Sequence, residues 1–169
     1  GPLPAFAARD TMVPGVDLLH STAFMTPPVS SQPLVYTVHD LSFLTHPMYH
    51  TIENIGFCKD NIERALKRNT TFIAVSEHTR RDMISLLHIE PSRINVIPNT
   101  FDPGLFHLYP DEAVARVRAK HKLPERYLLF LASIEPRKNL RTALEAVRSA
   151  DIGCPLVVAG AHGWLNSPL

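Results

Sequence analysis

The sequence has little cysteine, glycine or tryptophan, and it lacks long apolar runs. Among 169 residues there are two cysteines, seven glycines and one tryptophan. Cys58 and Cys154 stand far apart in the sequence and match no metal-binding spacing. We therefore expect no disulfide scaffold, and we expect the protein to occupy a reducing compartment. No stretch approaches the roughly 18 apolar residues that a membrane span requires.

Charge of one sign is also lacking, because 17 Lys and Arg residues are balanced by 16 Asp and Glu residues. Such a chain has no broad field for nucleic acid or an anionic membrane, so we expect no nucleic-acid partner and only local anion binding. His46 and His50 flank Pro47 without a metal-ligand spacing, and we expect no bound metal. No signal peptide is visible, which favours a cytoplasmic location. The chain begins Gly1-Pro2 without a methionine, as a fragment or processed protein does.

Strands and helices are predicted to alternate along the chain. Apolar runs predict strands at residues 16–20, 34–38, 71–75, 93–97, 127–132 and 156–160. Helices are predicted at about residues 51–68, 76–87, 111–122 and 139–150. This alternation implies an α/β fold with parallel sheets and right-handed crossovers.

Residues 99–110 are predicted to be an interdomain linker, because they follow Pro98 and contain Pro103, Gly104 and Pro110 without periodicity. After them the helix and strand pattern begins again. We therefore predict two parts of doubly wound domains, residues 1–98 and 111–169, with the linker between them.

A cationic loop, Ser133-Ile134-Glu135-Pro136-Arg137-Lys138-Asn139, separates the predicted strand 127–132 from the last predicted helix. Arg137 and Lys138 oppose the helix dipole, which is reasonable if an anion binds between them. Together with free helix N–H groups they predict a phosphate cradle at the carboxyl edge of a parallel sheet. The alternative is a pair of solvated cations. Glu135 is predicted to pair with Arg137 or to line the pocket.

Four further residues are candidates for a binding site. His39 ends a predicted strand and is expected to hydrogen-bond a ligand hydroxyl, unless the backbone satisfies it. Ser76 is expected to cap a helix, and Arg80 one turn later either faces an acceptor phosphate or is solvated. Gly160 either lets a ligand approach the backbone or forms a turn.

Five short motifs follow one another in an order that resembles a known family. They are Val38-His39-Asp40, Val75-Ser76-Glu77-His78-Thr79-Arg80-Arg81-Asp82, Val96-Ile97-Pro98-Asn99 with Asp102, Glu135-Pro136-Arg137-Lys138-Asn139, and Gly160-Ala161-His162-Gly163-Trp164. From about Asp17 to Trp164 the chain resembles the retaining glycosyltransferases of family 4, especially bacterial O-antigen and exopolysaccharide mannosyltransferases. The resemblance implies the GT-B architecture of two Rossmann-like domains. Residues 1–98 would be the C-terminal part of the acceptor domain, and 111–169 the N-terminal part of the nucleotide-sugar domain.

The resemblance implies transfer of a hexose, with mannose from GDP-mannose as a candidate, to a glycan or lipid-linked saccharide in polysaccharide biosynthesis. The nucleotide sugar would be a substrate, with no cofactor or metal. The basic end of the predicted helix 51–68 offers peripheral contact with the inner membrane face as an alternative location, whereas the acidic residues of that helix favour a soluble amphipathic helix. Lys138 and Arg137 would hold the donor diphosphate, and His39 would be the catalytic-site residue. Further pocket candidates are Ser133, Glu135, Gly160, Ser76 and Arg80.

The chain departs from the family pattern at three points. Ser133 stands where such enzymes often have Arg, and Thr100 replaces the glycine of a Pro-Asn-Gly linker. The family's paired glutamates, spaced eight apart, are expected beyond Trp164 and outside this sequence. Two alternatives therefore stay open: a non-catalytic fragment or binding module of the GT-B fold, and a GT-B sugar-nucleotide epimerase.

Overall fold

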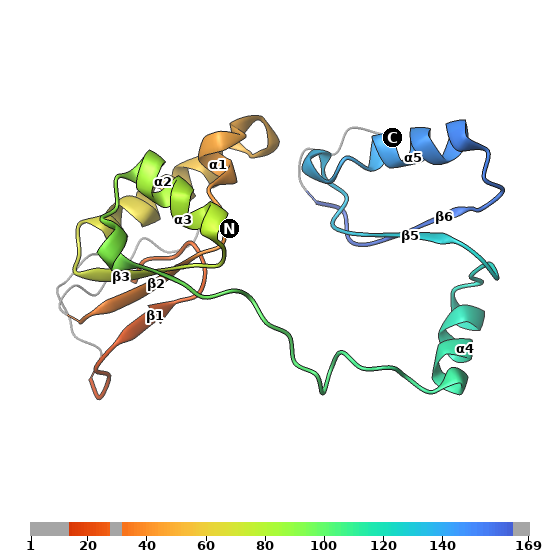
Figure 1. The fold of residues 1–169 in the computed structure, drawn as a ribbon, viewed down its shortest axis with the longest axis horizontal. Coiled ribbons are helices and arrows are strands. Elements are labelled where there is room, and N and C mark those ends of the chain that lie inside the picture. Colours follow the sequence, from red (N-terminus) through yellow and green to blue (C-terminus); the bar gives the residue numbers. More distant parts are fainter. Residues whose placement is uncertain (1–13, 28–31, 164–169) are drawn as a thin grey trace. The chain divides into compact units, whose positions relative to one another are not determined.

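The computed structural model describes residues 14–27 and 32–163 (Figure 1). The chain divides into two compact units, Gly1–Thr100 and Phe101–Leu169, and each is described by itself. The segment 99–110 contains no helix or strand. Its role as a linker, and the assignment of acceptor and donor roles to the two parts of the chain, stay predictions.

The first unit contains a four-stranded parallel sheet in the order β1-β2-β3-β4. Its strands are β1 (Leu19–Ser21), β2 (Leu34–Val38), β3 (Thr70–Ala74) and β4 (Ile94–Val96). In the register Tyr36 lies opposite Phe72, and Phe72 lies opposite Ile94. Strands that follow one another in order through right-handed crossovers place their connecting helices on one face. Figure 1 shows α2 (Ile52–Leu66) and α3 (Glu77–Leu87) on that face.

The two long helices of the first unit begin at side-chain caps. The Thr51 hydroxyl accepts a hydrogen bond from the Asn54 N–H at 3.2 Å, and Ser76 accepts one from the Thr79 N–H at 3.0 Å. Ser76 is therefore the N-cap, as predicted. The sequence did not indicate the short helix α1 (Ser42–Thr45) or the 3₁₀ turns Pro47–Tyr49 and Pro91–Arg93. Elements of three or four residues are too short to show a period.

The core of the first unit lies between the sheet and these helices. The Tyr36 and Phe72 rings meet edge to face with centroids 6.1 Å apart, and both side chains are fully buried. Burial raises the pKa of Tyr36 to about 12, because the charged phenolate would be poorly solvated in this core. Helix α2 contributes Ile62 and Ala65 to this core, and α3 contributes Met83.

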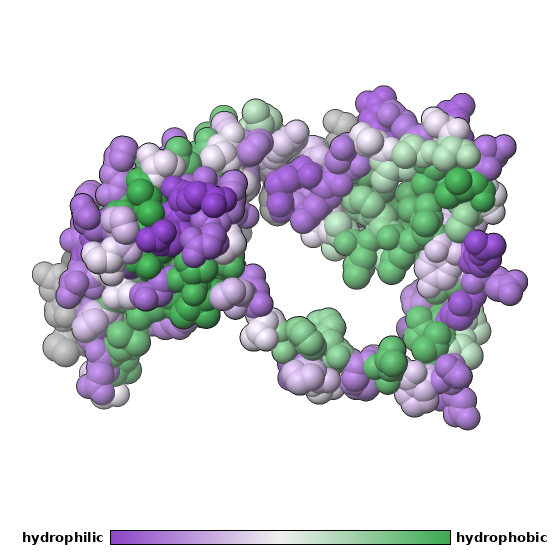
Figure 2. Space-filling view, viewed as in Figure 1, coloured by the Kyte–Doolittle hydropathy of each residue, from purple (hydrophilic) through white to green (hydrophobic). Residues whose placement is uncertain are grey.

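The second unit contains α4 (Asp111–Lys120), β5 (Leu128–Leu131), α5 (Leu140–Ala150) and β6 (Leu156–Ala159). Strands β5 and β6 pair in parallel, which confirms the predicted α/β class for this part as well. Among the described residues of this unit Leu140 is the one buried apolar side chain. Much of the sheet's apolar surface is exposed, as Figure 2 shows, and Leu131 is 74% exposed.

Replacing Phe72 by Ala is expected to destabilise the first unit by about 3–5 kcal/mol, because it removes a fully buried ring and leaves a cavity. The matched control is Ile52→Ala, since Ile52 at the start of α2 is 85% exposed. Urea unfolding followed by circular dichroism measures both changes. Equal midpoints for the two variants would contradict this assignment of the core.

Candidate functional site

The candidate residues fall into two groups, each beyond the carboxyl ends of parallel strands. The first unit carries His39, Ser76 and Arg80, and the second carries Ser133, Glu135, Arg137, Lys138 and Gly160. Loops at this edge of a parallel sheet are where α/β folds commonly bind ligands.

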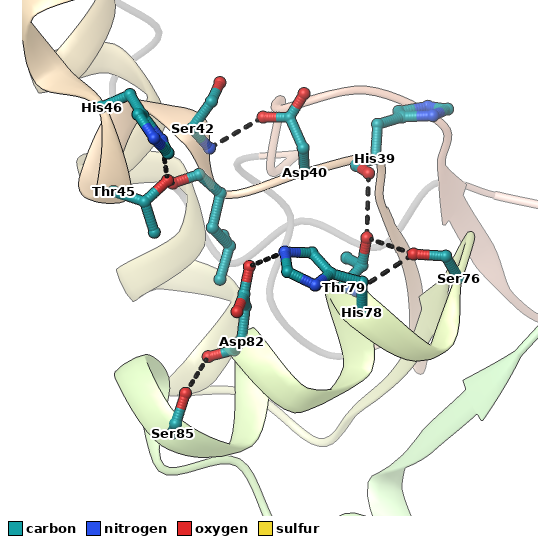
Figure 3. Close-up of polar contacts among 11 residues, drawn as sticks. His39, Asp40, Ser42, Thr45, His46, Ser76, His78, Thr79, Asp82 and Ser85 are labelled. Atoms are coloured by element: carbon teal, nitrogen blue, oxygen red, sulfur yellow. Dashed lines mark hydrogen bonds and ion pairs between the residues drawn. The ribbon is translucent and has the colours of Figure 1, made fainter.

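His39 follows β2 and has an exposed ring. Its Nε2 lies 2.9 Å from the carbonyl oxygen of Thr22. A carbonyl only accepts hydrogen bonds, so Nε2 carries the proton of this bond and the Nδ1 of a neutral ring remains an acceptor. Among the described residues Nδ1 has no hydrogen-bond partner, and Figure 3 shows the ring turned away from Ser76 and Thr79. The backbone thus satisfies one nitrogen and leaves the other for a ligand.

A hydroxyl pair joins the start of α3 to the backbone of His39 (Figure 3). The Thr79 hydroxyl donates to the His39 carbonyl oxygen at 3.2 Å, and the Ser76 hydroxyl lies 3.0 Å from that of Thr79. Since Thr79 has only one hydroxyl proton, Ser76 donates within the pair. The sequence analysis assigned no role to Thr79. Its position three residues after a serine N-cap is the sequence feature that could have indicated this contact.

Arg80 lies one turn into α3. Its Nη1 is 3.9 Å from Glu77 Oε2, and both side chains are partly exposed. A surface pair of this kind contributes little to stability and leaves the guanidinium free to exchange partners. Contact of Ser76 or Arg80 with an acceptor stays a prediction.

A chain of hydrogen bonds ties the loop after β2 to α2. Asp40 Oδ1 accepts from the Ser42 N–H at 2.9 Å and so forms a turn two residues long. The Ser42 hydroxyl lies 2.9 Å from His50 Nε2, and His50 Nδ1 lies 3.0 Å from Asn54 Oδ1. Sequence reasoning considered His50 only as a metal ligand and missed this connection.

The part of the chain that the structure describes has neither a metal-binding cluster nor a membrane-spanning helix. No group of three or more His, Cys, Asp or Glu side chains is placed there to hold a metal ion. No helix of residues 14–27 or 32–163 is long and apolar enough to cross a bilayer.

In the second unit the loops after β5 and β6 run side by side. The Ile134 N–H donates to the Ala161 carbonyl at 2.8 Å, and the Gly163 N–H donates to the Ile134 carbonyl at 3.0 Å. Gly160 has φ +152°, and a Cβ there would overlap the Ala132 carbonyl oxygen. The close approach at Gly160 is therefore to the chain's own backbone. Trp164, the last residue of this motif, lies outside the described residues.

Glu135 and Arg137 form an ion pair in the loop after β5. Arg137 Nη2 lies 2.8 Å from Glu135 Oε1, which confirms the predicted pairing. The Glu135 side chain is only 2% exposed, whereas that of Arg137 is 35% exposed. Glu135 Oε2 has no partner among the described residues. Ser133, at the start of this loop, is exposed.

Lys138 ends a 3₁₀ turn, Pro136–Lys138, directly before α5. The side chain of Lys138 is exposed and makes no ion pair among the described residues. Asn139 adopts φ +54° and makes no side-chain cap, so α5 begins at Leu140, one residue after the predicted start, with its first N–H groups uncapped. An exposed cation and an uncapped helix start are features that favour anion binding, and binding of a diphosphate here stays a prediction.

Comparison with known proteins assigns the family. Residues 3–105 match Glycosyltransferase Family 4. The chain belongs to this family. It is also 25% identical over 139 residues to O-antigen chain mannosyltransferase B of Escherichia coli. That match covers 80% of this chain and 36% of the relative, so the chain spans about a third of the relative's length.

Membership of this glycosyltransferase family, together with the parallel α/β units, confirms the predicted Rossmann-like fold class as part of a GT-B fold. The matched range 3–105 lies mainly in the first unit. Lys138 and Arg137 lie beyond it, so their role depends on the geometry of their own loop.

Gly160→Ala is expected to disrupt the pairing of β5 with β6, because its Cβ has no room beside Ala132 and its φ is strained for any L side chain. The control is Gly153→Ala, which at φ +58° meets no atom within 4 Å and costs about 1 kcal/mol of backbone strain. Amide exchange at Leu128 and Ala132, whose N–H groups donate to the Pro155 and Ala159 carbonyls, measures the effect. We expect clear acceleration in the first variant, and equal exchange in both would contradict it.

Proposed function

We propose that the protein containing this glycosyltransferase chain moves a hexose from a nucleotide sugar to a glycan or lipid-linked saccharide with retention of configuration. The observation that carries the proposal is the loop before α5, where Lys138 is exposed and without an ion pair among the described residues. Family membership supports glycosyl transfer in general, while donor, acceptor and stereochemistry belong to the proposal.

The donor side of the proposed reaction uses the second unit. When the sugar leaves, negative charge develops on the nucleotide diphosphate. A fixed cation and oriented N–H groups lower the barrier to that step. Lys138, the N-terminal turn of α5 and the exposed part of Arg137 provide such groups. We propose that they bind the diphosphate and that no metal ion is needed there.

The acceptor side uses the first unit. His39 Nδ1 is an available acceptor, so it suits a hydroxyl of the transferred sugar or of the incoming saccharide. The mannosyltransferase relative supports mannose as the transferred sugar, and we propose GDP-mannose as the donor. A lipid-linked acceptor would place the enzyme at the inner face of the membrane.

Lys138→Ala in the full-length protein is expected to lower turnover at least about tenfold, which corresponds to roughly 1.4 kcal/mol of barrier. The physical reason is the loss of an exposed cation that lies just before α5 and makes no ion pair among the described residues. The matched control is Arg148→Ala, which removes a cation from the last turn of the same helix. Initial rates of transfer from GDP-mannose to a saccharide acceptor measure both. An unchanged rate in Lys138→Ala would refute the cradle.

The 169-residue chain alone is expected to show little or no transfer, because Leu140 is the one buried apolar side chain among the described residues of its second unit. Calorimetric titration with GDP and GDP-mannose tests this. Micromolar binding would show a more complete donor site than we propose. If the full-length protein epimerised or hydrolysed the nucleotide sugar without transfer to any acceptor, the transferase proposal would fail.

A further inference from the structure

Glu135 is the one buried charged side chain among the described residues. It lies in the same loop as the two proposed diphosphate-binding cations, where a carboxylate would by itself repel a phosphate. Burying a charge is costly unless the charge is paired. The pairing of Glu135 with Arg137 is therefore the contact in which a role for Glu135 is to be sought.

The burial of Glu135 is produced by backbone from a second loop. A Cβ at Gly163 would lie 3.2 Å from the Glu135 Cβ and 3.2 Å from the Ile134 carbonyl oxygen. Glycine at this position therefore lets the loop after β6 close on Glu135. The Lys138 N–H also donates to the Glu135 carbonyl at 3.0 Å. Glu135 is thus held by both loops, whereas the guanidinium of its partner Arg137 is held only through its contact with Glu135.

Arg137 uses Nη2 to contact Glu135 and keeps its other guanidinium donors unused among the described residues. A guanidinium has five N–H groups in a planar fork, so one edge can bind a carboxylate while another binds a phosphate. The partnerless Oε2 can accept a second N–H of the same guanidinium, which allows the fork to adjust without leaving Glu135.

We propose that Glu135 is a positioning residue that holds the Arg137 guanidinium oriented toward the diphosphate of the nucleotide-sugar donor. This inference rests on the proposed function of the loop. A long arginine side chain loses conformational freedom when it binds a ligand, and a partner that orients it beforehand reduces that loss.

Positioning and charge neutralisation predict opposite results for Glu135→Gln. This variant keeps the shape and one oxygen acceptor but removes the negative charge. If Glu135 merely cancelled a cation, the variant would raise the local charge and tighten diphosphate binding. If Glu135 positions Arg137, the weaker hydrogen bond lets the guanidinium move, and binding weakens.

The experiment measures affinities of GDP, UDP, ADP and dTDP for the full-length protein by calorimetry, together with kcat and KM for transfer. We expect Glu135→Gln to weaken the best-bound diphosphate about tenfold, in the range found for residues that orient a binding group. The effect should vanish in an Arg137→Ala background, because nothing is then left to position. The matched control is Glu145→Gln, which alters the exposed Arg141–Glu145 pair of α5 and should change nothing.

Tighter diphosphate binding by Glu135→Gln would overturn the positioning role, as would an equal loss of affinity with and without Arg137. Either result would leave the proposed diphosphate site standing. If no nucleoside diphosphate binds, or if Arg137→Ala and Lys138→Ala leave affinity unchanged, the proposed diphosphate site itself fails. Should Glu135→Gln not fold, Arg137→Lys tests the pair from its other end. It keeps the charge but lacks the planar fork, so we expect about tenfold weaker binding, and unchanged binding would overturn the inference.

Discussion

Parallel pairing of neighbouring strands is the constraint on which both candidate sites depend. Because β2 and β3 run in the same direction, the loops that carry His39 and Ser76 leave the sheet at one edge. The same pairing of β5 with β6 brings Glu135 beside Gly163. An antiparallel arrangement would send these loops to opposite ends of the sheet and leave no common edge for a ligand.

Local pattern was enough to predict five of the six strands, the four long helices and the Ser76 cap, because each depends on neighbouring residues. The first strand runs from Leu19 to Ser21 and not over residues 16–20 as predicted. Local pattern was less reliable where burial decides. The period that indicated α2 includes both Ile62, which is buried, and Ile52, which is 85% exposed. Helix α1 was not predicted, since four residues show no period.

The residues of the candidate site were proposed from the sequence, but their contacts could not be predicted. Arg137 and Lys138 could be recognised from their position before a helix, and the pairing of Arg137 with Glu135 from their spacing. The burial of Glu135 could not be predicted, because the residue that packs against it, Gly163, lies in a different loop. Gly160 was predicted to form a turn or to let a ligand approach the backbone. Its actual close neighbour is Ala132, which strand pairing brings next to it. These contacts are long-range, so no local pattern encodes them.

The sparse burial of the second unit would make its folding depend by mass action on the ligand proposed for it. A molecule that binds only the folded form stabilises it by about 2.7 kcal/mol when its concentration is a hundred times Kd. For a unit whose described part buries a single apolar side chain, Leu140, this is a large share of what holds it together. On the proposal that this unit binds a nucleotide sugar, the cellular supply of that molecule would govern how long the unit survives proteases.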